Sequence, residues 1–304
     1  MTTRPRFGRL LTAMVTPFDK DGALDIKRSA ELAQRLFDHG SDGLVVNGTT
    51  GESPTISREE RTNLFRSVLE GAGTRGPIIA NVGDNCTEDT VLFAQKISRI
   101  GVDAIMVVTP YYNKPPQEGL YRHFRSVAEA VDVPVILYNI PGRCVINIEP
   151  ETITRLAHDV ENIVAVKQAN PNLDEVTQIL ENTPEDFEIL SGDDGLTLPM
   201  MRRGASGVIS VLSHIAGPSM KAMIGYEVAG EHEKAQQYAD ILNPLADALF
   251  MTSNPIMVKD ALAIEGFPVG GVRLPLVEPT QEQHEKLVSV MNESFAQLQT
   301  LENK

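Results

Sequence analysis

Short, continuous runs of apolar and β-branched residues recur along the chain, with centres roughly 20–35 residues apart, the length of one strand–helix unit. They are not alternating, which is typical of parallel strands buried on both faces. The pattern predicts eight strands, at 11–15, 43–46, 77–82, 103–108, 133–138, 162–166, 187–190 and 206–211.

Helical segments separate these runs. Ser57 followed by Glu60 predicts a capping box at the start of one helix, and glycines at 40, 101 and 204 stand where helix C-caps belong. Eight such units predict an α/β fold, a (β/α)8 TIM barrel, over residues 1–225. A doubly wound sheet is the alternative, although no G-x-G-x-x-G motif follows the first predicted strand.

No strand-like run of comparable quality follows Ile209. The pattern predicts three helices, about 226–250, 255–265 and 279–300, separated by loop signals at Asn254-Pro255 and Gly270-Gly271. We therefore expect a C-terminal helical region, 226–304, attached to the barrel.

Composition narrows the classes of function. Of 304 residues, 42% are apolar and 22% charged, with a net charge of −14, so binding to a nucleic-acid backbone is not expected. No apolar run is long enough to span a membrane, and no secretory signal is visible. The only cysteines, Cys86 and Cys144, are expected to be free thiols in a reducing cytoplasm.

One lysine stands at an unusual place. Lys167 directly follows the predicted strand 162–166 and is the only lysine between residues 115 and 220. Burial at a strand end disfavours the ammonium and lowers a lysine pKa, and a neutral amine there can attack a carbonyl to form a Schiff base. The alternative is a structural ion pair with Asp193, Asp194 or Glu52.

Other candidate groups follow other strands, and active sites of such barrels lie at the carboxyl ends of the strands. The segment 47–53 has two glycines and two threonines and could cradle a carboxylate, or be an ordinary turn. The segment 109–116 holds Tyr111 and Tyr112, which could instead be loop packing. Tyr138 ends a strand, and Arg143 follows it with a guanidinium suited to carboxylates or to a surface ion pair.

Metal and cofactor chemistry find little support in the sequence. Asp193 and Asp194 could bind a divalent cation, but a helix-capping or supporting role is favoured because Gly195 and a helix follow. The six histidines are scattered, and no H-x-H or H-E-x-x-H motif occurs. Phosphate-binding loops, nucleophile elbows and dinucleotide fingerprints are missing as well. We therefore expect no cofactor and no metal site.

Several of these segments occur together in one order. They are 48–53 (GTTGES), 109–113 (TPYYN), 138–143 (YNIPGR), Lys167, 191–194 (SGDD) and 207–211 (GVISV). Together they resemble the dihydrodipicolinate synthase family, part of the pyruvate-dependent class I aldolase superfamily that includes N-acetylneuraminate lyase. The resemblance extends from Gly8 to the C-terminal helices.

The resemblance implies catalytic roles. Lys167 would form a Schiff base with pyruvate, and Thr49 and Thr50 would hold the pyruvate carboxylate. Tyr138 would move protons, and Thr49 would connect it with Tyr112 in a relay. In the family this last tyrosine comes from a neighbouring subunit, so a homotetramer built from two dimers is expected.

The second substrate is also implied by the resemblance. Arg143 would bind the carboxylate of aspartate-β-semialdehyde, and Gly192 and Ile209 would line the pyruvate pocket. The product would be 4-hydroxy-tetrahydrodipicolinate, on the route to lysine and diaminopimelate. Alternatives are another pyruvate-dependent aldolase, similar to N-acetylneuraminate lyase or to 2-keto-3-deoxy acid aldolases, and a non-catalytic paralogue that binds a keto acid.

The sequence departs from the family pattern at two places. The residues after the lysine are Gln168-Ala169-Asn170-Pro171, where the family usually begins with an acidic residue. Arg58 and Arg61 stand where lysine-inhibited members have histidines. Because these two cations would repel a lysine ammonium, we expect weak or absent feedback inhibition by lysine.

Overall fold

In the computed structural model, which describes residues 5–303, eight parallel strands follow one another in chain order around a closed barrel. The predicted TIM barrel is therefore confirmed, and the doubly wound sheet is excluded. The strands are β1 (Leu10–Ala13), β2 (Gly43–Val46), β3 (Ile78–Asn81), β4 (Ala104–Val108), β5 (Val135–Asn139), β6 (Ile163–Gln168), β7 (Glu188–Ser191) and β8 (Gly207–Ser210).

Helices alternate with the strands and then form the C-terminal region. They are α1 (Ile26–Asp38), the 3-10 helix η1 (Ser53–Thr55), α2 (Arg58–Ala72), α3 (Thr87–Ser98), α4 (Gln117–Ala128), α5 (Pro141–Cys144), α6 (Pro150–Asp159), α7 (Leu173–Asn182), α8 (Thr197–Met201), α9 (Ser213–Val228), α10 (His232–Leu249), α11 (Ile256–Ile264) and α12 (Gln281–Glu302). No helix within residues 5–303 combines the length and the apolar character that crossing a bilayer requires.

Local signals in the sequence explain several helix ends. Ser57 accepts a hydrogen bond from the N–H of Glu60 while the Glu60 side chain accepts one from the N–H of Ser57, so the predicted capping box is present. The glycines at 40, 101 and 204 have φ angles of 96°, 97° and 111°, a region that residues with a Cβ rarely adopt. These glycines therefore end the helices as predicted.

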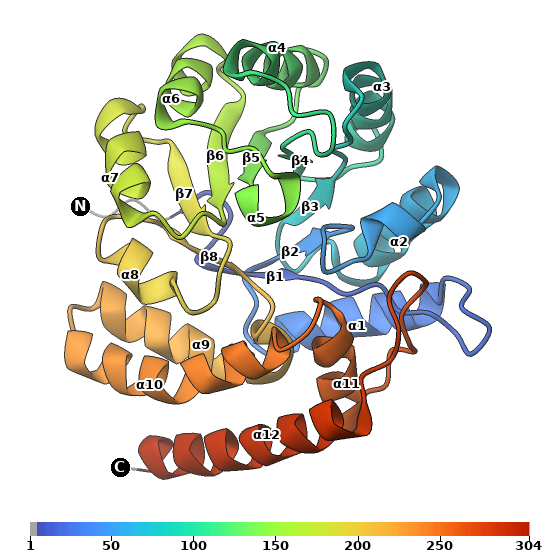
Figure 1. The fold of residues 1–304 in the computed structure, drawn as a ribbon, viewed down its shortest axis with the longest axis vertical. Coiled ribbons are helices and arrows are strands. Elements are labelled where there is room, and N and C mark those ends of the chain that lie inside the picture. Colours follow the sequence, from blue (N-terminus) through green and yellow to red (C-terminus); the bar gives the residue numbers. More distant parts are fainter. Residues whose placement is uncertain (1–4, 304) are drawn as a thin grey trace. The chain divides into compact units, whose positions relative to one another are not determined.

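The described chain divides into two compact units. Unit 1 comprises Pro77–Ile209 and the described part of Met1–Arg9, and unit 2 comprises Leu10–Gly76 and Ser210–Lys304. In unit 1, α3, α4, α6 and α7 pack in succession and line the outer side of the strands (Figure 1). The residues of β4, β5 and β6 are buried almost throughout, so these strands form the core of the unit.

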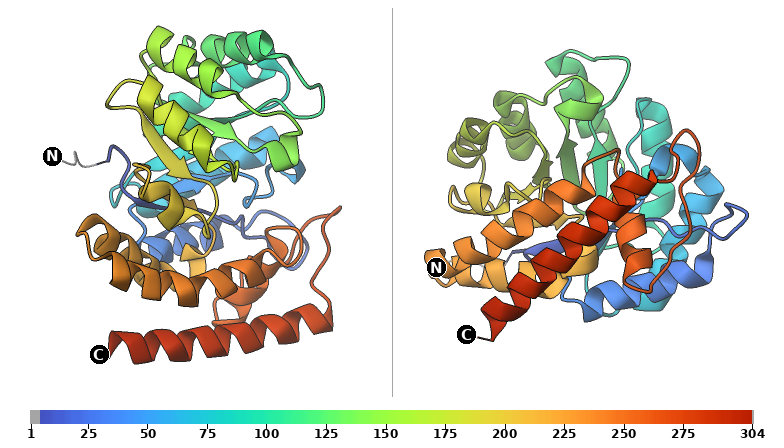
Figure 2. Two further views of the ribbon diagram at one scale, coloured as in Figure 1. Left: turned by 60° about the vertical axis from the view of Figure 1, so that its left-hand side comes forward. Right: turned by 60° about the horizontal axis from the view of Figure 1, so that its bottom comes forward.

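Unit 2 joins the beginning and the end of the chain. Strands β1 and β2 pair, α1 packs on α2, and α9 contacts both β1 and α10. The long helix α12 packs on α10 and α11 (Figure 2) and buries Leu287, Met291 and Leu298.

The C-terminal helices differ in detail from the prediction. The helix expected at 226–250 is divided, because α9 ends at Val228, Gly230 has a φ of 79°, and α10 begins at His232. The other two expected helices correspond to α11 and α12. The division into a barrel (1–225) and a helical region (226–304) stays a prediction, and its boundary lies inside α9.

Candidate active site

Lys167 and Tyr138 lie side by side at the ends of β6 and β5. The two residues are partners in the parallel register, and the Lys167 Nζ lies 4.3 Å from the centre of the Tyr138 ring. Their exposed fractions are 5% and 3%, so the expectation of a buried lysine at this strand end is confirmed. No ion pair to Lys167 occurs within residues 5–303, so the alternative of a structural ion pair has no support there. The arrangement places an unpaired amine beside a phenol out of solvent.

The end of β4 fixes the tip of β5. The backbone N–H and the hydroxyl of Thr109 both donate to the Tyr138 carbonyl, each at 2.9 Å. The thiol of Cys144 donates to the Thr109 carbonyl at 3.2 Å, which attaches the short helix α5 to the same point. Burial raises the pKa of this thiol to about 11, so Cys144 stays protonated and unreactive near neutral pH.

Arg143 lies on α5 and is exposed, and its guanidinium has no ion-pair partner in the described part of the chain. Tyr112 is 88% exposed, with a φ of 76°. An aromatic side chain so exposed does not pack against the buried lysine of its own chain. Both residues are available to groups from outside this chain.

Gly192 permits the close approach of the strand ends. A Cβ at this position would lie 2.7 Å from the Cβ of Ala169, closer than real side chains come. The Gly192 N–H donates to the Gln168 carbonyl at 2.8 Å. Ile209 is 1% exposed on β8. These two predicted pocket residues belong to the strand ends of unit 1, like Lys167 and Tyr138.

The turn after β2 lies in unit 2 and carries Thr49 and Thr50. The Thr50 hydroxyl accepts a hydrogen bond from the Asn254 side chain at 2.9 Å, and the Gly51 carbonyl accepts one from the Thr16 hydroxyl at 2.7 Å. Among the described residues, the backbone N–H groups of Thr49 and Thr50 have no hydrogen-bond acceptor. Free N–H groups on a fixed turn can bind a carboxylate.

A buried ion pair between Lys259 and Glu52 lies next to this turn. The Nζ of Lys259 lies 2.6 Å from a carboxylate oxygen of Glu52 and donates to the Gly271 carbonyl at 2.6 Å. The side chains are only 3% and 1% exposed. Burial lowers the pKa of Lys259, and the neighbouring Glu52 carboxylate opposes this effect.

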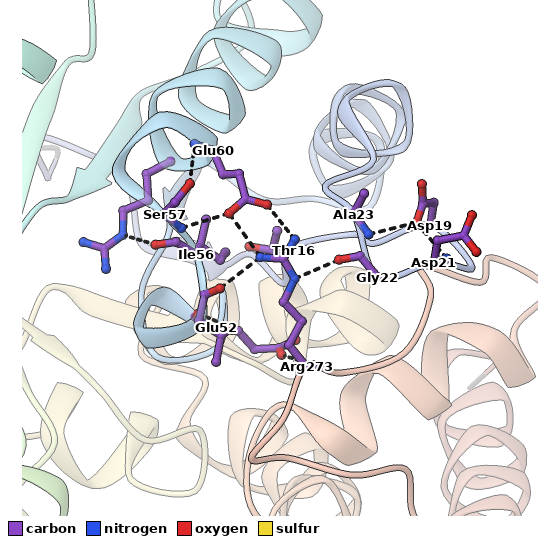
Figure 3. Close-up of polar contacts among 12 residues, drawn as sticks. Thr16, Asp19, Asp21, Gly22, Ala23, Glu52, Ile56, Ser57, Glu60 and Arg273 are labelled. Carbon is purple, nitrogen blue, oxygen red and sulfur yellow. Dashed lines mark hydrogen bonds and ion pairs between the residues drawn. The ribbon is translucent and has the colours of Figure 1, made fainter.

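Arg273 extends the same cluster (Figure 3). Its backbone N–H donates to Glu52 at 2.9 Å, and its guanidinium donates to the carbonyls of Gly22 and Thr55. The guanidinium also pairs with Glu60 at 2.6 Å. Hydrogen bonding from Arg273 lowers the pKa of Glu60 from 4.5 to about 2. The loop after α11, through Arg273, thereby holds Glu52, Thr55 and Glu60, which follow the turn of Thr49 and Thr50 (the threonine turn).

Sequence reasoning missed five residues that support the site: Asn139, Asn147, Glu175, Asn254 and Lys259. Each acts through a partner on another element, so spacing along the chain gives no sign of it. The only available signal is the position of Asn139 and Gln168 directly after Tyr138 and Lys167.

A (β/α)8 barrel with a buried lysine at a strand end is typical of one class of protein, the barrel enzymes in which a lysine amine attacks a carbonyl carbon. The chain belongs to the Dihydrodipicolinate synthetase family, whose pattern it matches over residues 6–294.

Known relatives cover nearly the whole chain. The 4-hydroxy-tetrahydrodipicolinate synthase of Symbiobacterium thermophilum is 51% identical over 290 residues, 95% of this chain and 99% of the relative. The enzyme of that name from Bacillus subtilis is 47% identical over 94% of this chain and 99% of its own length. The crystal structure of a dihydrodipicolinate synthase from Bacillus anthracis superposes with a TM-score of 0.93 at 47% identity, covering 95% of this chain and 98% of the other.

Proposed function

We propose that this chain condenses pyruvate with aspartate-β-semialdehyde through a Schiff base at Lys167. The reaction is that of the family: it gives 4-hydroxy-tetrahydrodipicolinate, in the biosynthesis of lysine and diaminopimelate. The observation that supports the role of Lys167 is its buried, unpaired amine 4.3 Å from the ring centre of Tyr138.

The proposed chemistry begins with attack of the neutral amine on the pyruvate ketone. Loss of water gives a protonated imine, which serves as an electron sink for the adjacent methyl group. Removal of a methyl proton gives an enamine, whose carbon attacks the aldehyde and forms the new carbon–carbon bond. The amine of the second substrate then attacks the imine carbon, closes the ring and releases Lys167.

Tyr138 is the proposed proton carrier, because its ring lies beside the lysine amine and its phenol can donate and accept a proton. Thr49 and Thr50 are proposed to bind the pyruvate carboxylate, with Thr49 passing protons between Tyr138 and Tyr112. The free N–H groups of the threonine turn support the first role. Gly192 and Ile209 are proposed to line the pyruvate pocket.

Tyr112 supports a proposal about assembly. Its 88% exposure leaves the phenol free to enter the site of a neighbouring subunit. We propose a dimer as the smallest complete unit and a homotetramer of two dimers as the assembly. We also propose a cytoplasmic location, which fits a biosynthetic role and the two free cysteines.

The first experiment tests Lys167. Borohydride treatment in the presence of pyruvate should attach a reduced adduct to Lys167, located by peptide mass spectrometry, and Lys167→Ala should lose both adduct and turnover. Wild-type protein without an adduct would contradict the Schiff-base mechanism.

The second experiment tests the aldehyde. With pyruvate fixed, aspartate-β-semialdehyde should be consumed, and N-acetylneuraminate should not be cleaved. Arg143→Ala should raise the KM for the aldehyde at least about tenfold, the effect of one hydrogen-bonded ion pair. Arg99→Ala, which removes another exposed arginine of unit 1 at the C-terminal end of α3, serves as control and should behave like wild type.

A further inference from the structure

The loop that carries Arg143 has an unfavourable backbone conformation. Val145 follows α5 with a φ of 71°, and a β-branched residue is rarely found in this left-handed region. Its side chain is 67% exposed, so packing around Val145 does not explain the conformation. Other contacts must hold residues 141–148, called here the Arg143 loop.

Asn147 joins this loop to several neighbouring elements, in addition to the contact of Cys144 with Thr109. Its side-chain oxygen accepts hydrogen bonds from the amides of Asn139, at 2.6 Å, and Asn170, at 3.1 Å. Its side-chain nitrogen donates to the two carboxylate oxygens of Glu175, at 3.1 and 3.3 Å. Its backbone carbonyl accepts from the side chain of Gln117 at 2.8 Å. Both ends of the Asn147 amide are thus engaged.

The same network reaches the strand ends that carry the proposed catalytic pair. Asn139 and Gln168 are register partners, one residue beyond Tyr138 and Lys167. Because side chains alternate along a strand, their amides point to the opposite face of the barrel wall from Tyr138 and Lys167. Both are fully buried, and Asn139 donates to Gln168 at 2.8 Å while accepting from the N–H of Ile148 at 3.1 Å.

Glu175 is the only charged member of the network. Besides Asn147, its carboxylate accepts hydrogen bonds from Asn170 at 3.0 Å and from Asn172 at 3.3 Å. All of these contacts come from N–H donors, so the site requires a group that only accepts. A glutamine at position 175 would turn an N–H donor toward at least one of them.

We infer that Glu175, acting through Asn147, is a positioning residue that holds the Arg143 loop in the conformation that receives the aldehyde carboxylate. The inference rests on the proposed function of Arg143. Lys167 is fixed separately, by the backbone ladder between β5 and β6, so loss of Glu175 should affect the second substrate and spare the first.

The test compares two isosteric variants with a matched control. Glu175→Gln and Asn147→Asp should each raise the KM for aspartate-β-semialdehyde at least about tenfold. The KM for pyruvate and the borohydride-trapped adduct should change less than about twofold. Asp174→Asn removes the same charge from the same first turn of α7, but from an exposed side chain outside the network, and should match wild type.

The combined variant, Asn147→Asp with Glu175→Gln, exchanges donor and acceptor. Its KM for the aldehyde should lie below that of either single variant, a rescue that general destabilisation would not produce; Asn170 or Asn172 still loses its acceptor, so the rescue should be partial. The inference is overturned if Glu175→Gln leaves this KM unchanged while Arg143→Ala raises it, if both substrates are affected equally, or if the combined variant shows no rescue. Failure of wild-type protein to form the pyruvate adduct would instead contradict the proposed function.

Discussion

Replacing Lys259 by methionine removes one partner of a buried ion pair and leaves the other in place. Glu52 would keep the hydrogen bond from the Arg273 N–H at 2.9 Å but lose the ammonium at 2.6 Å. With 1% of its side chain exposed, the carboxylate cannot regain this interaction from water. Methionine has a similar length and can pack on the Phe18 ring, whose centre lies 4.2 Å from the Lys259 Nζ. The variant therefore isolates the loss of charge.

Breaking a buried ion pair on one side costs about 3–5 kcal/mol of unfolding free energy. An unfolding entropy of about 2.1 cal/mol/K per residue gives about 0.64 kcal/mol/K for 304 residues, so a loss of about 4 kcal/mol lowers Tm by about 6 °C. Glu52 comes directly after the turn that is proposed to bind the pyruvate carboxylate, so a displaced Glu52 should also raise the KM for pyruvate.

The assay is calorimetric unfolding of wild type, Lys259→Met, Glu52→Gln and the double variant at one protein concentration. In the double variant no buried charge lacks a partner, so its Tm should exceed that of Lys259→Met. A decrease in Tm below about 1.5 °C for Lys259→Met, corresponding to about 1 kcal/mol, would refute the reasoning, as would strictly additive single effects.

Three further predictions concern separate features. Glu60 has a folded-state pKa of about 2 against an ordinary 4.5, so its stabilising contribution is present above pH 4.5 and lost as pH falls toward 2. The difference in Tm between wild type and Glu60→Gln should therefore shrink between pH 4.5 and pH 2. A constant difference over that range would contradict the prediction. Gly192→Ala should push Ala169 away and lower turnover, because the added Cβ would lie 2.7 Å from the Ala169 Cβ; wild-type kinetics would refute this. Lysine should inhibit weakly or not at all. The Arg61 guanidinium is held beside η1 by two backbone carbonyls, and its positive charge would repel the lysine ammonium. Half-inhibition by sub-millimolar lysine would contradict this prediction.

The barrel could be predicted because its strands are short apolar runs with local signals around them. Every predicted strand is present, with ends shifted by a few residues, and the capping box at Ser57 and the helix-ending glycines are where the sequence places them. The helix expected at 226–250 was predicted as continuous because Gly230 alone is a weak signal of a break within a helical pattern.

The site was predictable only where a residue's neighbours in sequence determine its setting. Lys167 follows a buried strand, so its burial could be inferred from the chain alone. Lys259 lies in an ordinary helical pattern, and its burial depends on Glu52 in a distant turn. Asn147 and Glu175 are common polar residues whose roles come from contacts between different elements. Such pairings arise from tertiary structure and leave no periodic pattern.

The contact between Arg273 and Glu52 joins positions 221 residues apart in the sequence. At about 5–20 residues per second, a ribosome needs about 10–45 s to proceed from one to the other. During that time Glu52 lacks both the Lys259 ammonium and the Arg273 N–H that contact it in the folded chain. Completion of unit 2, whose second part begins at Ser210, therefore has to wait for the last part of translation.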